Sequence, residues 1–435
     1  MLHGVLRLHR RALGHACCAQ DDRIFMIPSL RTQFNANFTP ERYRAFLRQV
    51  DDVSGTHVSF RLSETPCFFP KELIGRMAAD GKDLIRQLVG NAEYLTKSEL
   101  AVPAEFKVPN EPKHPMFVQV DFGLVRDAAG ELQPKLVELQ AFPSLYAYQG
   151  PLAEAYVEAY GLEKLASGAG RQASGAASGR LKYLLSGLET SSYRELLRRA
   201  IVGDHDPENV ILMEIDPLHQ KTLPDFLLTQ KMLGVRTVDI VDIKKEGSRL
   251  YYERAGTRVP IERIYNRAIV DELERKNVKL QFDWRDELEV EWAGHPNWYF
   301  RISKFSIPYL KHASVPKTWF LDRLSEIPED LENYVLKPLY SFAGLGVLIA
   351  PTRADIAAIP AEKRPYYILQ ERMHFEPVIE TPFGGTKAEV RVMYVWLDEL
   401  VPVLTIIRMG RGLMMGVDHN KNLEWVGASA GFYLD

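Results

Sequence analysis

Three observations in the sequence predict a protein of the α/β class, or more broadly of the α+β class. Residues 209–266 alternate between apolar strand patterns and a helical pattern, which is typical of a small α/β domain with a partly parallel sheet. Residues 117–125 and 135–139 alternate apolar and polar side chains on either side of a turn, and this predicts a β-hairpin. Further strand patterns occupy the C-terminal third, at residues 334–350, 366–373, 388–396 and 401–412.

Length and composition predict an ordinary globular protein of a reducing compartment. At 435 residues the chain exceeds one hydrophobic core, so we expect two or three subdomains that share an interface. The formal net charge of −3 gives no general attraction to nucleic acid or to an anionic membrane. The three cysteines match neither a disulfide framework nor a zinc site, and no apolar run approaches the roughly 18 residues of a membrane span. We therefore expect a cytoplasmic protein that binds neither nucleic acid nor membrane.

The first predicted region comprises residues 26–200. Residues 1–25, which precede it, contain arginines that interrupt any signal-peptide core, and we expect them to be poorly ordered. Helical apolar spacing is found at residues 39–48, 70–88 and 152–165, with a strand expected within residues 58–69. Residues 167–180 are small and polar, which favours a flexible loop at a boundary or over the site.

The predicted hairpin in this region presents oxygen ligands to one place. Because strand side chains alternate between two faces, Asp121 lies on one face of the first strand, and Glu138 and Gln140 share a face of the second. A tight turn brings these carboxylate and amide oxygens together, and oxygen ligands of this kind suit Mg²⁺. The alternative interpretation is a solvated hairpin face.

The second predicted region, residues 201–296, is the small α/β domain. Ligands of such domains bind at the carboxyl ends of the strands. Asn266 and Arg267 follow one predicted strand, and the guanidinium of Arg267 suits a carboxylate. Arg61, in the first region, is a further candidate for the acceptor site. A structural contact is the alternative role for each of these residues.

The third predicted region, residues 297–435, contains the strongest nucleotide-binding pattern. Within residues 334–350 an apolar strand carries Lys337 and leads through a glycine-containing turn into a second apolar strand. The turn residues of interest are Ser341, Gly344 and Gly346. Here backbone N–H groups can approach phosphate oxygens with no Cβ in the way. The alternative is an ordinary β-hairpin with an exposed lysine.

Further charged residues accompany this pattern. Lys304 begins a predicted helix, from which it can reach the same phosphates. Gln370 and Glu371 end an apolar strand, where backbone groups can pair with an adenine edge and a carboxylate with ribose hydroxyls. Arg391 and Arg408 lie on two later strands, and fixed guanidiniums stabilise the charge that phosphoryl transfer develops. Each arginine taken alone is also compatible with an ordinary surface position.

The order of these residues resembles the ATP-grasp superfamily. There, an acidic metal-binding strand pair ending in Glu-x-Asn normally follows the arginine strands, whereas here the acidic pair, residues 117–140, precedes the small α/β domain. This order is similar to that of circularly permuted ATP-grasp proteins such as glutathionylspermidine synthase and its relatives. The resemblance implies a circularly permuted ATP-grasp fold with two lobes around a nucleotide site. Residues 201–296 would then form a pre-ATP-like domain, and residues 297–435 the nucleotide-binding lobes.

The resemblance also implies a role for each candidate residue. It implies Asp121, Glu138 and Gln140 as Mg²⁺ ligands, and Lys304, Lys337 and residues 341–346 at the ATP phosphates. It places Gln370 and Glu371 at adenosine, and Arg391 and Arg408 at the transferred phosphate or acyl phosphate. Gln140 replaces the usual asparagine, and residues 341–346 lack the charges of the corresponding synthetase loop. The first departure leaves open whether the site is catalytically competent, and because of the second the sequence does not support thiol-polyamine chemistry.

The sequence therefore predicts an ATP- and Mg²⁺-dependent ligase. It would activate a small-molecule or peptide-like carboxylate as an acyl phosphate and pass it to an amine, with Lys337, Arg391 and Arg408 as catalytic residues. Arg411 and Asn420, in the polar loop after the second arginine strand, are further candidates for substrate binding. Two alternatives remain: a nucleotide-binding regulatory or scaffolding module, and a small-molecule kinase. The substrates and the oligomeric state are left open.

Overall fold

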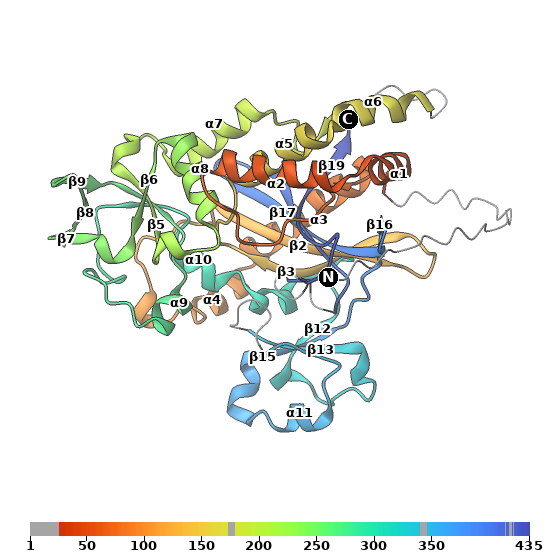
Figure 1. Ribbon diagram of the computed structural model, residues 1–435. Helices are drawn as coiled ribbons and strands as arrows, with labels where there is room; N and C mark the ends of the chain where they lie inside the picture. Colours follow the sequence, from red (N-terminus) through yellow and green to blue (C-terminus); the bar gives the residue numbers. More distant parts are fainter. Residues whose placement is uncertain (1–25, 173–178, 340–345, 414, 417–419, 421) are drawn as a thin grey trace, which may run out of the picture.

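The computed structural model has a mixed α/β architecture with several sheets, in agreement with the predicted fold class (Figure 1). It describes residues 26–172, 179–339, 346–413, 415–416, 420 and 422–435. Residues 1–25, predicted to be poorly ordered, and the turn residues Ser341 and Gly344 lie outside this part of the chain. Among the described helices, none combines the length and the apolar character that crossing a membrane requires.

The largest sheet joins strands from both halves of the sequence. Its order is β1-β19-β18-β17-β2-β3, with β4 paired to β19 and β16 paired to β17. The bounds are β1 Cys67–Phe68, β2 Phe117–Arg126, β3 Leu132–Gln140, β4 Leu181–Lys182, β16 Ile379–Thr381, β17 Gly384–Trp396, β18 Leu400–Gly410 and β19 Gly427–Leu434. β2 and β3 form the predicted hairpin, and β2 pairs antiparallel with β17. The hairpin is thus continuous with the arginine-bearing strands.

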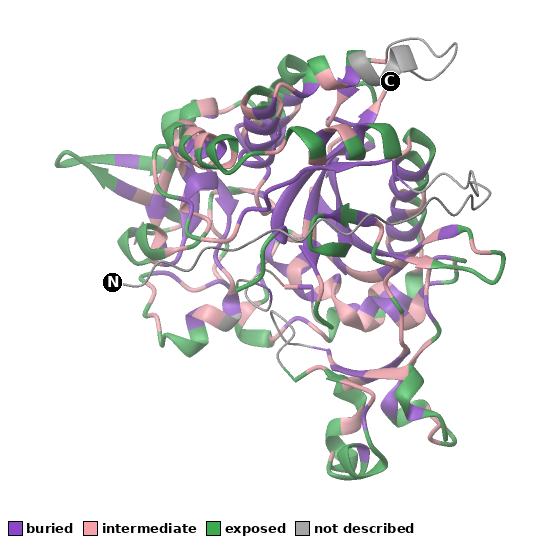
Figure 2. Ribbon diagram, turned by 45° about the vertical axis from the view of Figure 1, so that its right-hand side comes forward, coloured by how far each residue is buried: buried purple, intermediate pink, exposed green. Residues whose placement is uncertain are grey.

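Helix α3 (Lys71–Val89) packs against one face of the large sheet. Val120 of β2 alternates onto this face and belongs to the same apolar core as Met77 of the helix. The approach is close at Gly81, where an added Cβ would lie 2.2 Å from the hydroxyl oxygen of Tyr394. Figure 2 shows the resulting layer of buried strands between covering helices.

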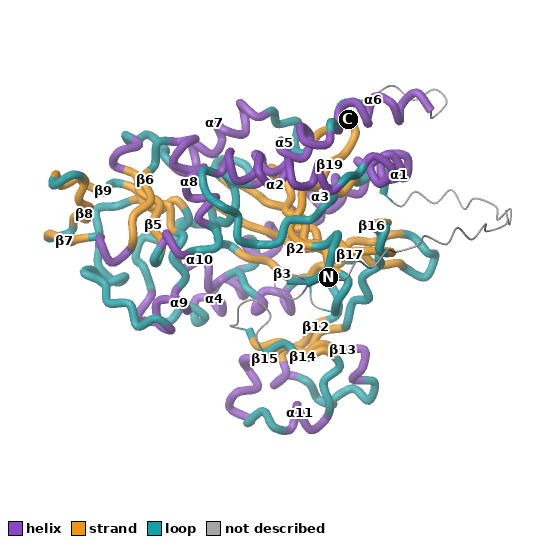
Figure 3. The backbone as a smooth tube through the Cα atoms, in the orientation of Figure 1, coloured by secondary structure: helices purple, strands orange, loops and turns teal. Residues whose placement is uncertain are grey.

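Helices α2 (Pro40–Ser54), α5 (Gln149–Tyr160) and α7 (Thr190–Ile201) form the layer over the opposite face (Figures 1 and 3). The Thr39 hydroxyl accepts the backbone N–H of Arg42 at the start of α2, and Gly55 ends the helix with φ 71°. The predicted helices at residues 39–48 and 70–88 are therefore confirmed, the first as the longer α2 and the second as α3, shifted by one residue. Remaining helices are α1 (Pro28–Asn37), α4 (Ala92–Glu99), α6 (Leu162–Gln172), α8 (Leu223–Leu233), α9 (Val270–Arg275), α10 (Pro296–Arg301) and α11 (Arg353–Ala357).

Two predictions for the first region were wrong in part. The strand expected within residues 58–69 is reduced to a single bridge between Leu62 and Ala428 and to β1. Between them the Ser63 hydroxyl accepts the N–H of Thr65 at 3.3 Å, and Pro66 has no N–H to donate to a neighbouring strand. The loop expected at residues 167–180 is also shorter, since residues 167–172 continue α6 and residues 173–178 lie outside the described chain.

A four-stranded parallel sheet forms the predicted small α/β unit. Its order is β11-β10-β5-β6, from β5 Val210–Glu214, β6 Arg236–Asp239, β10 Arg263–Asn266 and β11 Glu291–Ala293. All of its pairs are parallel, whereas the sequence predicted a partly parallel sheet. A three-stranded sheet of β7 Lys244–Glu246, β8 Arg249–Arg254 and β9 Thr257–Ile261 lies beside it. The carboxyl ends of β5 and β10 are followed by the segments that lead toward the site.

A small antiparallel sheet projects from the rest of the molecule (Figure 1). Its order is β12-β15-β13-β14, from β12 Thr318–Phe320, β13 Tyr334–Pro338, β14 Leu348–Ile349 and β15 Tyr367–Glu371. Leu336, Ile356 and Leu369 contribute to an apolar core of its own beneath the sheet. β13 and β14 are the two strands predicted on either side of the glycine turn. We refer to residues 318–371 as the small lobe.

Candidate functional site

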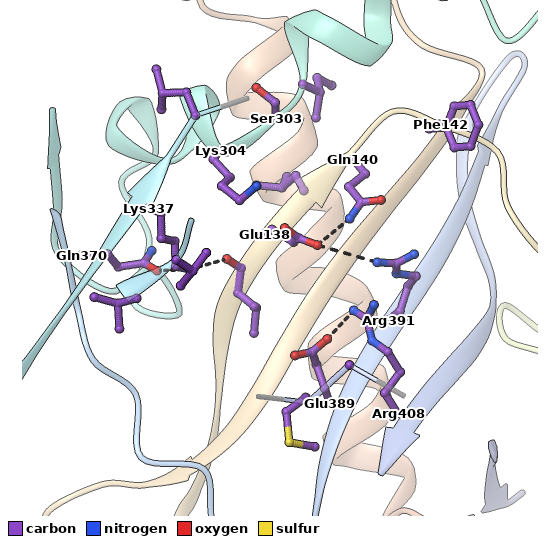
Figure 4. A pocket seen from close by; sticks show the side chains of 18 of the residues that line it. Glu138, Gln140, Phe142, Ser303, Lys304, Lys337, Gln370, Glu389, Arg391 and Arg408 are labelled. Carbon is purple, nitrogen blue, oxygen red and sulfur yellow. Dashed lines mark hydrogen bonds and ion pairs between the residues drawn. The ribbon is translucent and has the colours of Figure 1, made fainter. Parts of the chain in front are cut away.

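A cavity of about 1150 Å³ lies between the small lobe and the large sheet. The lining residues singled out by the sequence are Lys304, Lys337, Gln370 and Glu371 on one side and Glu138, Gln140, Arg391 and Arg408 on the other. Figure 4 shows their side chains converging from strands that are far apart in the sequence. The structure therefore brings together most of the residues that the sequence predicted for nucleotide and metal binding.

Strand register explains why the charged residues of the large sheet meet. Asp121 on β2 lies directly opposite Arg391 on β17 and opposite Glu138 on β3. Glu389 on β17 lies directly opposite Arg408 on β18. Residues directly opposite each other in antiparallel strands share a face, so the five side chains form one ionic row across four strands. We call this set the ionic row.

Asp121 is the centre of the ionic row. It is 1 % exposed, and Arg391 donates to both of its oxygens, from Nε at 2.6 Å and from Nη2 at 2.7 Å. Arg408 also donates to Oδ2. Burial by itself would raise the pKa of Asp121, but the two guanidiniums outweigh it and hold the pKa below its ordinary value. Asp121 thus binds two arginines instead of presenting free oxygens to Mg²⁺, which differs from the predicted role.

Two members of this network were not predicted from the sequence. The Glu389 carboxylate pairs with Arg408, and burial raises its pKa above the ordinary value. Gln119 is fully buried, and its amide oxygen accepts from Nη1 of Arg391 at 2.9 Å. The signal was available, because Glu389 shares the face of Arg391, and Gln119 shares the face of Asp121, at a spacing of two residues.

Glu138 and Gln140, predicted as metal ligands, both line the cavity on the side of the large sheet. The Gln140 amide nitrogen donates to Oε1 of Glu138 at 2.5 Å, and Nη2 of Arg391 lies 3.8 Å from the same oxygen. Adjacent ligands of an octahedral Mg²⁺ lie about 2.9 Å apart. Half a turn of the Gln140 amide would place its oxygen near that spacing from Glu138, so this pair fits two positions of a Mg²⁺ ion.

The other coordination positions of such a Mg²⁺ ion are not filled by a cluster of acidic side chains in the described part of the chain. Among the described residues, no group of three or more histidine, cysteine or acidic side chains is arranged to hold a metal. Mg²⁺ commonly uses one or two carboxylates and takes its other ligands from substrate phosphates and water. The donor set therefore fits Mg²⁺ only together with a phosphate-bearing ligand.

Lys337 is the buried cation on the small-lobe side. Its ammonium group donates to the amide oxygen of Gln370 at 2.6 Å and lies 3.5 Å from the carbonyl oxygen of Val137 on β3. Burial lowers its pKa to about 8, an effect that Glu138 opposes and Lys304 reinforces. Lys304, the first residue of a 3₁₀ helix (Lys304–Tyr309), lines the same cavity as Lys337.

Strand β15, which ends in Gln370 and Glu371, both supports Lys337 and lines the cavity. Gln370 lies opposite Val335 in the register of β15 and β13, and its amide nitrogen donates to the Thr318 hydroxyl at 3.0 Å. Its side chain thus fixes Lys337, and the predicted pairing of the strand's backbone with adenine stays a prediction. Glu371 lines the cavity and accepts the N–H of Lys317 at 3.3 Å. Gly346, at the end of the turn, has φ 73°, a conformation that glycine adopts readily.

Asn266 is the last residue of β10 and Arg267 follows it, but both lie behind the cavity wall. Both are fully buried. The guanidinium of Arg267 lies 5.0 Å from the ring centroid of Phe142, which does line the cavity, and it donates to the carbonyl of Pro143. The Asn266 amide oxygen accepts the N–H of Ala268 at 3.1 Å. These residues position the wall and do not form its surface.

Arg61, Arg411 and Asn420 hold loops together and do not line the cavity. Arg61 pairs with Glu64 and donates to the carbonyl of Leu423 at 3.3 Å. Arg411 donates to the carbonyl of Glu424 at 2.7 Å, and the Asn420 oxygen accepts the N–H of Arg411 at 3.1 Å. The predicted contacts of these three residues with substrate are therefore corrected to structural ones.

Comparison with known proteins gives the class of fold and nothing finer. No protein-family model matches the chain, and no curated protein matches it. A solved structure that does match is a glutathione synthetase-like effector, GSS30, from Globodera pallida, in its apo form. The match has a TM-score of 0.56 and 11 % sequence identity, and it covers 91 % of this chain and 99 % of that one. At this identity the likeness shows a common fold alone.

Proposed function

We propose that the protein is an ATP-dependent ligase that joins a carboxylate to an amine, with the permuted ATP-grasp arrangement. The observation that carries this proposal is the cavity in which Lys337 and Lys304 face Glu138, Gln140 and the ionic row. Two lysines on one side and a network that contains two guanidiniums on the other suit a polyphosphate and the charge that moves during its reaction. The likeness in fold to a glutathione synthetase-like protein supports the ligase class.

Chain order supports the permuted arrangement. The acidic hairpin β2–β3 precedes the parallel sheet, which precedes the small lobe, which in turn precedes the arginine strands β17 and β18. The acidic hairpin and the arginine strands nevertheless pair directly in one sheet. An ATP-grasp site cut before its acidic strand pair would have this connectivity.

The proposed reaction has two balanced steps. A carboxylate oxygen attacks the γ-phosphorus of ATP, the bond to the β-phosphate oxygen breaks, and ADP leaves. An amine then attacks the carbonyl carbon of the acyl phosphate, phosphate leaves with the bonding pair, and the ammonium formed loses a proton to give the amide. Lys337 and Lys304 would bind the phosphates, while Arg391 and Arg408 would stabilise charge on the transferred group. Mg²⁺ held by Glu138 and Gln140 would supply neutralisation of phosphate charge.

A second candidate is a nucleotide-binding module without ligase activity. The position of Asp121 favours it, because both of its carboxylate oxygens already bind guanidiniums and are not free to bind a metal. Gln140, where ATP-grasp proteins usually have asparagine, weakens a metal site further. Such a module would bind ATP but release no phosphate.

Phosphate release under saturating ATP and Mg²⁺ tests the proposal. The full chain is incubated with pools of amino acids, dipeptides and polyamines, and products are identified by mass spectrometry. A ligase gives substrate-dependent ADP and phosphate with a product one water lighter than its reactants, whereas a kinase gives a phosphorylated product. Lys337→Ala should abolish turnover, and Lys363→Ala, which removes an exposed lysine outside the cavity lining, should not. Binding of ATP without turnover in every pool would favour the module.

A further inference from the structure

One end of the cavity is lined by apolar and aromatic side chains that none of the proposed nucleotide contacts involves. These residues are Leu100, Pro103, Phe142, Val270, Tyr299 and Phe300. They come from the segment after α4, the loop after β3, helix α9 and helix α10, which lie side by side in Figure 1. In Figure 4, Phe142, one of the residues at this end of the cavity, lies on the far side of Gln140 from Lys337. We call this end the apolar end.

The wall of the apolar end is fixed by its own packing. Val270 and Phe300 belong to one small apolar core with Val102. The rings of Phe142 and Tyr299 meet edge to face, with centroids 5.7 Å apart and planes at 71°. Arg267 supports Phe142 from behind. A wall whose side chains are already positioned is suited to bind a ligand of defined shape without reordering.

The cavity is larger than one ligand needs. Pockets for single small molecules usually enclose roughly 300–1,000 Å³. The cavity here encloses about 1150 Å³ and continues from the lysines and the ionic row to the apolar end. A second compound can therefore bind next to a nucleotide, within reach of the same reacting centre.

An exposed apolar side chain marks where that second compound would lie. Leu100, at the apolar end, is 87 % exposed although it lines the cavity. Large apolar side chains left open in a concave site are covered when an apolar ligand group binds there. Lys221 and Glu274 also line this cavity and are exposed, and their opposite charges suit the charged groups of an amino acid.

We propose that the apolar end is a substrate subsite for an amino acid or short peptide that carries a bulky apolar side chain. The proposal rests on the ligase function proposed above and names the class of one of its two substrates. Leucine-sized or phenylalanine-sized side chains would pack against Leu100, Val270 and Phe300. Glycine and serine, which bury little apolar surface, would bind weakly.

Binding measured apart from turnover tests the proposal. The full chain, saturated with Mg²⁺ and a non-hydrolysable ATP analogue, is titrated by calorimetry with phenylalanine, leucyl-phenylalanine, glycine and glycylglycine. At least one apolar probe should bind tenfold or more tightly than its glycine counterpart. Leu100→Asp should weaken that binding at least tenfold. The matched control, Leu218→Asp, replaces a leucine that is 74 % exposed and lies outside the cavity lining, and it should leave the affinity unchanged.

The outcomes separate this proposal from the ligase function. Equal affinities for apolar and glycine probes, or apolar binding that Leu100→Asp and Leu218→Asp affect alike, would overturn the apolar subsite. Phosphate release with glycine probes alone would also overturn it while supporting a ligase. Selective apolar binding that depends on Leu100, with no phosphate release, would support the subsite and count against the ligase.

Discussion

Asp121→Asn removes the negative charge that the buried Arg391 and the half-buried Arg408 share. The carboxylate is fully buried, and Arg391 donates to it twice, at 2.6 and 2.7 Å, while Arg408 donates to Oδ2. Removal of one partner of a buried ion pair costs about 3–5 kcal/mol, because the other charge stays buried without compensation. Glu389 remains beside Arg408, whereas Arg391 keeps only Gln119 and a distant Glu138. We therefore expect the free energy of unfolding to fall by about 4 kcal/mol.

Urea denaturation followed by circular dichroism measures this loss. The control is Asp398→Asn, which makes the same change in an ion pair with Arg199 whose carboxylate is 85 % exposed, and it should cost at most about 1 kcal/mol. Because the pKa of Asp121 is lowered in the folded state, its contribution is present above the ordinary pKa near 4 and is lost as the pH falls through the lower folded pKa. If the two variants lose the same free energy of unfolding at pH 7, the claim that the Asp121 carboxylate stabilises the ionic row is refuted.

Three further predictions concern the site and its support. The affinity for ADP should fall about tenfold between pH 7 and pH 9, because Lys337, whose pKa is about 8, loses its proton. ADP titrations at several pH values measure this fall, and Lys337→Arg should make the affinity nearly independent of pH over this range. Glu138→Gln should make the dissociation constant of ADP independent of Mg²⁺, and a remaining Mg²⁺ effect of tenfold would contradict the ligand assignment. Gly123→Ala places a Cβ 2.2 Å from the ring of Phe375, so the free energy of unfolding, measured by thermal unfolding, should fall by about 1–3 kcal/mol. Gly55→Ala is the comparison variant, because Gly55 has a left-handed backbone but no atom near the added Cβ.

Strand alternation made much of the site predictable. It placed Asp121, Glu138 and Arg391 on faces that the strand register brings together, although the residues are far apart in the chain. Lys337 was identified because a lone lysine interrupts an apolar strand before a glycine turn. Side chains two residues apart on a strand share a face, and this spacing can be read directly from the sequence.

The partners of charged side chains were harder to predict from the sequence, because they depend on which strands become neighbours in the sheet. Asp121 was expected to bind Mg²⁺, since nothing in β2 reveals that Arg391 lies directly opposite it. Arg411 and Asn420 were expected at the substrate because they are polar loop residues. Their hydrogen bonds instead close a loop whose geometry depends on contacts with Glu424 and Gly416. The same limit applies to Arg267, whose stacking on Phe142 depends on tertiary structure.

The pairing of β2 with β17 has a consequence during synthesis of the chain. Asp121 and Arg391 are separated by 270 positions, and ribosomes add roughly 5–20 residues per second. The acidic hairpin therefore waits on the order of 15 to 50 seconds for its neighbouring strand, with β2 as an open sheet edge that can pair with other chains. The parallel sheet and the small lobe, each with its own apolar core, can form during that interval. We expect nascent chains stalled before β17 to engage chaperones at β2 and to gain nucleotide affinity only after β17 and β18 have emerged from the ribosome.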